Sequence, residues 1–152
     1  MAKQQSSNPA DVVVRGDARG FKQEIVVGKH RLLADEPESA GGTDSGPGPY
    51  DYLLAALGAC TSMTIGWYAR RKNFPLETIE VSLRYSRIYA KDCEECETKE
   101  GMLDRIEAEV ALGGPLTEEQ HARLMDIAAR CPVHRTLRSE INIRLRPASH
   151  SG

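Results

Sequence analysis

Residues 49–72 read PYDYLLAALGACTSMTIGWYARRK, a segment that predicts a long apolar helix. Pro49 suits the first turn of a helix, where an amide hydrogen would have no partner within the helix. One stripe of the segment carries five residues at helical spacing: Leu53, Leu57, Cys60, Thr64 and Tyr68. We therefore predict a helix to about Lys72 that buries this stripe. Because residues 53–59 are apolar on nearly all sides, we expect a sheet and another helix to cover it.

Segments with strand and helix signals flank this central helix. Before it, three short strands separated by glycine turns are predicted at residues 12–14, 21–27 and 30–34. After it, two alternating strands, two helices and a last strand follow, at residues 79–85, 106–112, 117–130, 132–139 and 141–145. The first of these helices begins at a capping box made by Thr117 and Gln120. The order of elements predicts an α+β domain with helices on an antiparallel sheet.

Length and charge limit the classes of function. The chain has 152 residues, 40% of them hydrophobic, which fits a single domain over residues 11–147 with flexible segments at 1–10 and 148–152. Lys and Arg number 20 against 22 Asp and Glu, so the basic surplus of a nucleic-acid binder is missing. No apolar run approaches a membrane span, and the first ten residues hold no apolar signal core. We expect a cytoplasmic enzyme or a binding domain.

Two of the four cysteines have positions that suit chemistry. Cys131 precedes Pro132 at the predicted start of a short helix, where unpaired amides and the helix dipole favour a thiolate. Cys60 lies in the middle of the central helix, so a reactive thiol there needs a nearby Arg or Lys. The alternative for each is a small buried apolar residue. Spacing alone does not say whether the two thiols meet.

Residues 49–60, PYDYLLAALGAC, and residues 131–137, CPVHRTL, carry a resemblance to a known family. They resemble the first and second motifs of the OsmC/Ohr superfamily, and the resemblance covers roughly residues 11–146. It implies an OsmC-like α+β fold in an intertwined homodimer. In that fold the two cysteines lie side by side, and the partner chain helps to wall the pocket. The best-known members reduce organic hydroperoxides.

The resemblance implies a thiol-dependent peroxidase. Cys60 is then the peroxidatic thiol, which becomes a sulfenic acid, and Cys131 is the resolving thiol, which forms a disulfide with it. An external dithiol reduces the disulfide, so neither a bound cofactor nor a metal is expected. An apolar pocket, supported by Tyr50, Asp51 and Leu57, suits a fatty or aromatic hydroperoxide.

The sequence departs from the peroxidase pattern just before the first cysteine. In those subgroups a glutamate follows the motif proline and orients a catalytic arginine, but here Tyr50 stands at that position. Asp51, one residue later, is rotated by about 100 degrees around a helix and faces elsewhere. The arginine belongs in the N-terminal strands, where Arg19 matches best by its distance from the cysteine. Arg15 and Arg31 are alternatives.

The other two cysteines form a C-x-x-C, Cys93-Glu94-Glu95-Cys96, in a charged connection over residues 91–101. A structural zinc site needs four ligands, and no second such pair is present. Neighbouring carboxylates raise thiol pKa values and slow thiol reactions. An exposed thiol pair, a reversible disulfide and a weak metal site stay open, and we favour a loop feature without a catalytic role. Two alternatives to the peroxidase follow: a non-enzymatic small-molecule-binding dimer, and a redox or metal sensor that uses this loop.

Overall fold

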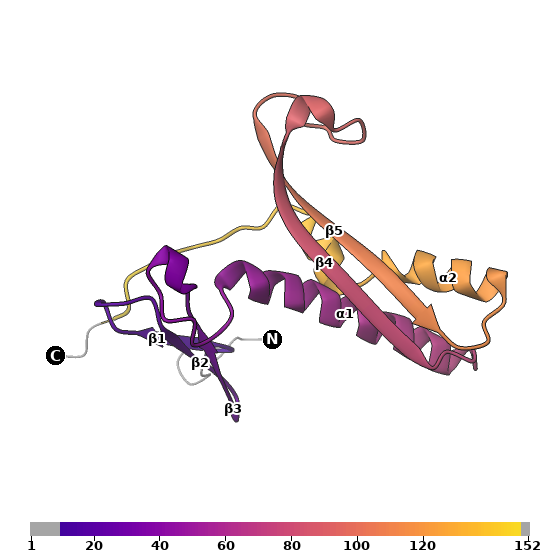
Figure 1. The fold of residues 1–152 in the computed structure, drawn as a ribbon, viewed down its shortest axis with the longest axis horizontal. Helices are drawn as coiled ribbons and strands as arrows, with labels where there is room; N and C mark the ends of the chain where they lie inside the picture. The colour runs from indigo at the N-terminus through magenta and orange to yellow at the C-terminus, as the bar shows by residue number, and fades with distance from the viewer. Residues whose placement is uncertain (1–9, 150–152) are drawn as a thin grey trace. The chain divides into compact units, whose positions relative to one another are not determined.

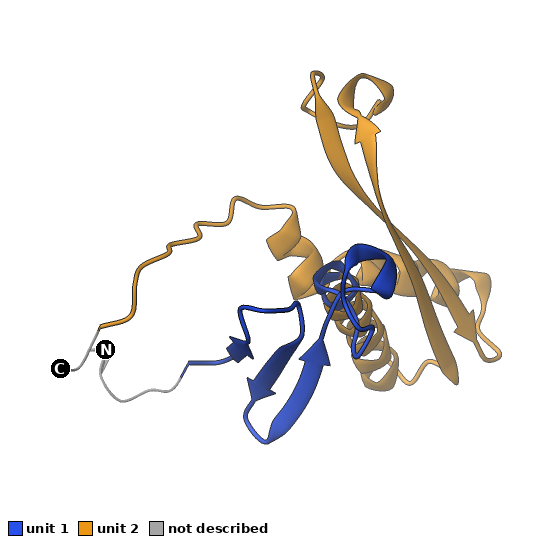
Figure 2. Ribbon diagram, turned by 60° about the vertical axis from the view of Figure 1, so that its left-hand side comes forward, with its two compact units in different colours: residues 1–53 blue, residues 54–152 orange. Residues whose placement is uncertain are grey.

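The computed structural model describes residues 10–149. Of the segments expected to be flexible, 1–10 and 148–152, residues 1–9 and 150–152 lie outside the described residues. The chain divides into two compact units, residues 1–53 and residues 54–152 (Figure 2). The expectation of one domain over residues 11–147 stays a prediction.

The first unit is built on a three-stranded antiparallel meander. Its strands are β1 (Val13–Gly16), β2 (Gln23–Val27) and β3 (His30–Ala34), in the order β1-β2-β3. They confirm the three strands predicted before the central helix. Gly28 forms the turn between β2 and β3 with a φ of 57°, a conformation that favours glycine.

A buried carboxylate organises the loop between β3 and the central helix. Asp35 accepts hydrogen bonds from the hydroxyls of Thr43 (2.6 Å) and Ser45 (2.8 Å), and from three backbone amides, those of Glu36, Thr43 and Ser45. These donors favour the charged form and hold the pKa of Asp35 well below its usual range. The loop, which includes the short 3-10 helix η1 (Glu38–Ala40), is thereby fixed where it leads into the next helix.

The central helix α1 (Pro49–Arg71) begins and ends close to the predicted bounds. Its buried residues are Leu57, Gly58, Thr61, Ile65 and Ala69. The predicted stripe was therefore wrong in phase, because apart from Leu57 its members lie beside the buried face. A helix that is apolar on nearly every side has no unique inward face, so contacts with other elements decide it. At Gly58 a Cβ would lie only 2.7 Å from Leu83 Cδ1, so α1 approaches the next strand closely there.

The second unit packs α1 against a helix and a long hairpin (Figure 1). Strands β4 (Thr78–Tyr89) and β5 (Met102–Gly113) pair antiparallel along their full length. Helix α2 (Glu118–Ala128) begins at the predicted capping box of Thr117 and Gln120. The core cluster consists of four buried residues: Ile65, Ala69, Leu124 and Ala128. The far end of the hairpin, which holds the short 3-10 helix η2 (Ala90–Asp92), extends beyond both helices.

The C-terminal part contradicts one prediction. Helix α3 (Pro132–Leu137) is present, but residues 140–149 have no regular secondary structure, so the strand predicted over residues 141–145 is wrong. Its alternating apolar side chains, Ile141, Ile143 and Leu145, are exposed. A strand needs a neighbour that accepts its backbone hydrogen bonds, and nothing in the described residues pairs with this segment. Over the same described residues, every helix is too short or too polar to span a membrane.

Candidate functional site

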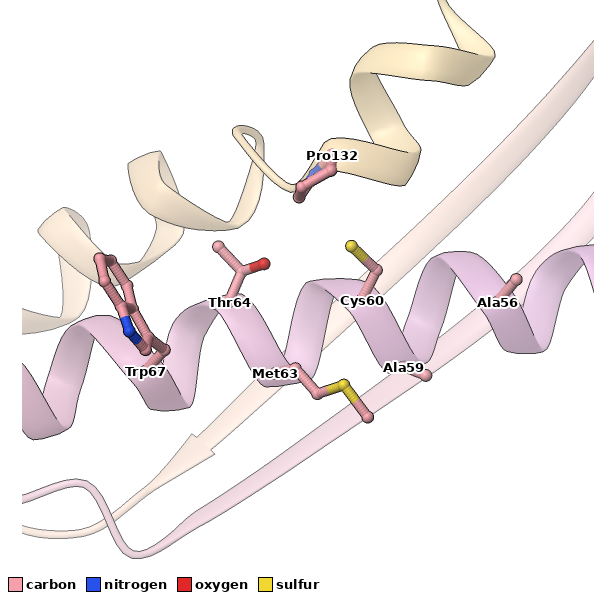
Figure 3. A pocket seen from close by; sticks show the side chains of 7 residues that line it. All are labelled: Ala56, Ala59, Cys60, Met63, Thr64, Trp67 and Pro132. Carbon is pink, nitrogen blue, oxygen red and sulfur yellow. The ribbon is translucent and has the colours of Figure 1, made fainter. Parts of the chain in front are cut away.

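The second unit contains an open, apolar cavity of about 550 Å³ beside α1. Six of its lining residues come from α1 and the seventh is the first residue of α3: Ala56, Ala59, Cys60, Met63, Thr64, Trp67 and Pro132. Cys60 and Thr64 point from α1 toward the segment that carries Pro132 (Figure 3). The cavity therefore presents one thiol, from Cys60, one thioether, from Met63, and one hydroxyl, from Thr64, among hydrocarbon and aromatic groups.

Cys60 is a free thiol, and its side chain is half-buried. It reaches the cavity because it lies beside the buried stripe of α1 and not on it. A nucleophile in this position is open to a small molecule in the cavity, and the neighbouring side chains offer that molecule apolar contacts.

Cys131 is the N-cap of α3, as predicted, and its thiol is free and fully buried. Its Sγ accepts a hydrogen bond from the His134 amide at 3.3 Å. The same sulfur lies 3.7 Å from Oγ1 of Thr61, which donates to the Leu57 carbonyl at 2.8 Å. Cys131 therefore contacts the residue that follows Cys60, and Pro132, which follows Cys131, lines the cavity of Cys60. The fold brings the two cysteine motifs to one place.

The residues predicted to support the pocket have other contacts. Leu57 is buried and does not line the cavity. Asp51 accepts a hydrogen bond from the Gly48 amide at 2.9 Å, which caps the start of α1. Tyr50 is exposed on the first turn of the same helix. A supporting role for these three residues stays a prediction.

The three candidate arginines all belong to the first unit. Arg19 binds Asp17 through two hydrogen bonds, Nε to Oδ1 at 2.9 Å and a terminal nitrogen to Oδ2 at 2.7 Å. This pair lowers the pKa of Asp17 to about 2 and raises the pKa of Arg19. Arg31 pairs with Glu24 at 2.6 Å, and Arg15 is exposed on β1. Which arginine serves Cys60 stays a prediction.

Of the seven lining residues, sequence reasoning proposed only Cys60 as a site residue, and the largest of those it missed are Met63 and Trp67. Both are strongly exposed, at 72% and 54%, although their side chains are large and apolar. The guanidinium of Arg71 stacks over the Trp67 ring at 5.0 Å. A usable signal was present, because residues three and seven positions after Cys60 share its side of a helix.

The second cysteine pair lies at the hairpin tip and is oxidised. Cys93 and Cys96 form a disulfide with their Cα atoms 5.4 Å apart. The sequence left open a thiol pair, a disulfide and a weak metal site, and the structure contains a disulfide between the two cysteines. Within residues 10–149, no three His, Cys, Asp or Glu side chains group so that they could hold a metal ion.

Comparisons with known proteins identify a matching family and similar solved structures. A family model described as OsmC-like protein matches residues 42–146. Similar solved structures include an OsmC-like protein from Mycoplasma pneumoniae, with 22% identity and a TM-score of 0.67 over 86% of this chain and 88% of that chain. An organic hydroperoxide resistance protein OsmC from Legionella pneumophila has 20% identity and a TM-score of 0.61 over 88% and 92%.

The organic hydroperoxide resistance protein OhrB of Bacillus subtilis has 21% identity and a TM-score of 0.57 over 86% of this chain and 91% of that chain. No match was found among curated proteins. At these identities the solved structures establish the fold, which confirms the predicted α+β class with antiparallel sheets. The family model matches more than half of the chain, and the chain belongs to the family of OsmC-like proteins.

Proposed function

We propose that this protein is a thiol peroxidase that reduces organic hydroperoxides to alcohols. One observation carries the proposal: the free thiol of Cys60 lines an apolar cavity, and the free thiol of Cys131 lies against the neighbouring Thr61. Organic hydroperoxide resistance proteins among the structures with this fold support the same activity.

The chemistry uses the two thiols in turn. The Cys60 thiolate attacks the outer oxygen of the peroxide, the O–O bond breaks, and an alkoxide leaves and takes up a proton to become the alcohol. Cys60 is then a sulfenic acid. The Cys131 thiol attacks this sulfur, water leaves, and a Cys60–Cys131 disulfide forms. An external dithiol reduces the disulfide with two electrons and two protons.

The cavity favours substrates with an apolar group. Met63 and Trp67 offer large contact surfaces beside Cys60, and hydrogen peroxide has nothing to place against them. We therefore expect alkyl and aryl hydroperoxides to react faster than hydrogen peroxide.

Arg19 completes the proposed catalytic set, with Arg15 and Arg31 as alternatives. A guanidinium near Cys60 would stabilise the thiolate and the peroxide oxygen that becomes negative. The proposal also includes a homodimer. Its support is the exposed apolar surface of the chain, at Met63 and Trp67 on α1 and at Ile143 and Leu145 near the C-terminus.

The proposal requires no bound cofactor, because the reducing electrons come from the dithiol. It includes a cytoplasmic location, where thiol pools are kept reduced and can regenerate the two cysteines.

A non-enzymatic binding protein is the second candidate. The position of the motif glutamate holds Tyr50, and the nearby Asp51 carboxylate accepts the Gly48 amide at the start of α1. An acid engaged in capping leaves less capacity to orient an arginine for Cys60. The cavity would then bind apolar molecules without turnover.

The test follows consumption of cumene hydroperoxide and of hydrogen peroxide in the presence of a dithiol. Wild type is compared with Cys60→Ser and with the Cys93→Ser/Cys96→Ser double variant as a matched control. We expect turnover that prefers cumene hydroperoxide, is lost in Cys60→Ser and is retained in the control. Trp67 is the single tryptophan of the chain, so its fluorescence reports binding of the product cumyl alcohol.

The two candidates give different results. A peroxidase shows turnover and a fluorescence change, whereas a binding protein shows the fluorescence change alone. Peroxide consumption no faster than that of a free thiol in all three proteins would reject the peroxidase.

A further inference from the structure

The tip of the β4–β5 hairpin comprises residues 90–101. It extends beyond α1 and α2 and contains the Cys93–Cys96 disulfide (Figure 1). We propose that this disulfide exchanges reversibly with dithiols and that its reduction loosens residues 90–101. The proposal does not depend on peroxidase activity at Cys60.

The disulfide supplies much of what holds the tip together. Among residues 90–101, all of them described, only Ala90 and Cys93 are buried. The other side chains are exposed or half-buried, and most of them are charged or polar. A segment with so little buried apolar surface has few contacts to retain its shape once the covalent link is broken.

The hydrogen bonds of the tip converge on the backbone beside the disulfide. The Cys93 amide donates to the Ala90 carbonyl at 3.1 Å, and the Ala90 amide donates to the Gly101 carbonyl at 2.8 Å. Lys99 Nζ donates to the carbonyls of Cys93 at 2.8 Å and Glu94 at 3.2 Å. Because the disulfide holds these carbonyls in position, breaking it weakens the Lys99 bridge as well.

The two sulfurs differ in access, which sets the direction of attack. Cys93 is only 2% exposed, whereas Cys96 is half-buried. A thiolate of the dithiol attacks Cys96 Sγ, the S–S bond breaks, and the electron pair leaves with Cys93, which takes up a proton. The second thiol of the dithiol then attacks the other sulfur of the reagent, the one bonded to Cys96 in the mixed disulfide. This releases Cys96, which is protonated, and leaves the reagent as a disulfide. Two electrons and two protons have moved to the chain.

The loop closed by the bond is short, since its cysteines are three positions apart. A disulfide that closes a short loop restricts the unfolded chain less than one that closes a long loop, so it adds less stability. Five carboxylates surround it against two ammonium groups: Asp92, Glu94, Glu95, Glu97 and Glu100 against Lys91 and Lys99. This negatively charged surface repels thiol reductants that carry a negative charge, so a neutral dithiol is the better reductant.

The first experiment uses wild type and the Cys60→Ser/Cys131→Ser variant of the full chain, in which only the tip pair can exchange. The protein is equilibrated at graded ratios of reduced to oxidised dithiothreitol and alkylated. Mass spectrometry then counts the labels on Cys93 and Cys96. We expect both cysteines to gain and lose label together, at the same ratio from either direction. A pair that stays oxidised at every ratio would overturn the proposal, because the bond would be purely structural.

The second experiment measures loosening by trypsin cleavage after Lys91 and Lys99. We expect cleavage at both lysines to be about tenfold faster in the reduced protein. The Cys93→Ser/Cys96→Ser variant should be cleaved at the fast rate with or without dithiothreitol. Equal cleavage rates in oxidised and reduced wild type would overturn the proposal, and this comparison needs no substitution.

A monothiol trap tests the direction of attack. The oxidised Cys60→Ser/Cys131→Ser variant is treated briefly with 2-mercaptoethanol and quenched with acid, and mass spectrometry locates the mixed disulfide. We expect the adduct on Cys96, because its sulfur is the accessible one while the disulfide is intact. An adduct mainly on Cys93 would contradict the assigned order.

Discussion

The two cysteine pairs of this protein are brought together in different ways. Cys60 and Cys131 are far apart in sequence, and their motifs meet because α1 and the start of α3 pack in the same unit, where Cys131 Sγ lies 3.7 Å from Oγ1 of Thr61. Cys93 and Cys96 are three positions apart and meet through a local turn. The first pair therefore depends on a folded core, and the second depends on the hairpin tip alone.

The surroundings of the two pairs differ as much as their origins. Cys60 opens into an apolar cavity, and Cys131 is buried behind it. The tip pair lies among carboxylates and lysines, away from that cavity. Under the two proposals, the apolar cavity binds hydrophobic substrates and the charged, short loop gives a reductant access to its disulfide. The same functional group would then serve two kinds of redox chemistry in one chain.

The first prediction, and the one with the greatest change in stability, tests whether the Cys60–Cys131 pair depends on the hydrophobic core while the Cys93–Cys96 pair does not. Leu124 is fully buried in the core cluster with Ile65 and Ala69. We expect Leu124→Ala to lower the free energy of unfolding of the second unit by about 2–5 kcal/mol, through lost burial and a cavity. Urea denaturation measures this change. Alkylation of the oxidised variant should show less Cys60–Cys131 disulfide and an unchanged tip disulfide.

Leu103→Ala is the matched control for this substitution. Leu103 is a half-buried residue of β5 near the tip, so its truncation should lower the free energy of unfolding by only about 1 kcal/mol. A Leu124→Ala protein that keeps its full stability would contradict the prediction that the Cys60–Cys131 pair depends on the core cluster around Leu124.

Much of this architecture was predictable from sequence, because the signals are local. The capping box of Thr117 and Gln120, the glycine turn at Gly28 and the helix-starting Pro49 each depend on neighbouring residues only. Cys131 was placed at a helix N-cap for the same reason, since Pro132 cannot continue a preceding helix.

The rest depended on contacts that no local pattern contains. Contacts with Leu83 and with α2 decide the inward face of α1, so its buried face runs through Thr61, Ile65 and Ala69 and the predicted stripe lies at its border, where Tyr68 still packs against the core. The apolar alternation at Ile141, Ile143 and Leu145 is a true strand pattern without a neighbour in the described residues. Trp67 lines the cavity because it lies seven positions after Cys60, on the same side of α1.

The second prediction concerns the resolving thiol. We expect Cys131→Ser to lower steady-state turnover of cumene hydroperoxide tenfold to a hundredfold, roughly, because the Cys60 sulfenic acid has no adjacent thiol to condense with. A single turnover should remain. Mass spectrometry after dimedone labelling should find the adduct on Cys60. The matched variant Cys96→Ser removes a thiol from the tip pair and should leave turnover unchanged.

The outcome that would contradict this prediction is a Cys131→Ser protein with wild-type steady-state rates. In that case the external dithiol would reduce Cys60 directly. The buried Cys131 would then be a core residue, and the contrast between the two pairs would disappear.

The third prediction tests the apolar character of the first site. Trp67→Ala removes an aromatic ring from the cavity wall, so kcat/KM for cumene hydroperoxide should fall about tenfold while that for hydrogen peroxide stays the same. Tyr89→Ala is the control, since Tyr89 is an exposed aromatic residue next to the tip. It should leave both values unchanged. Equal losses for the two peroxides in Trp67→Ala would show damage to the fold rather than a lost substrate contact.

The smallest expected effect concerns the hydroxyl between the two motifs. Thr61→Val keeps the shape of the side chain but removes Oγ1, which lies 3.7 Å from the Cys131 sulfur and donates to the Leu57 carbonyl. The free energy of unfolding should fall by about 1 kcal/mol. Among residues 10–149, Cys131 then keeps only the His134 amide as a hydrogen-bond partner, so its sulfur is held less firmly for the proposed attack on Cys60.

We therefore expect formation of the Cys60–Cys131 disulfide to slow about threefold in Thr61→Val, a loss typical of one weak positioning contact. Acid-quenched alkylation at successive times measures this rate, and the initial oxidation of Cys60 should be unaffected. Thr98→Val, on the exposed tip, is the control and should change neither rate. If Thr61→Val slowed the oxidation of Cys60 instead, the hydroxyl would act on the peroxidatic thiol. The burial of Cys131 would then matter for stability more than for resolution.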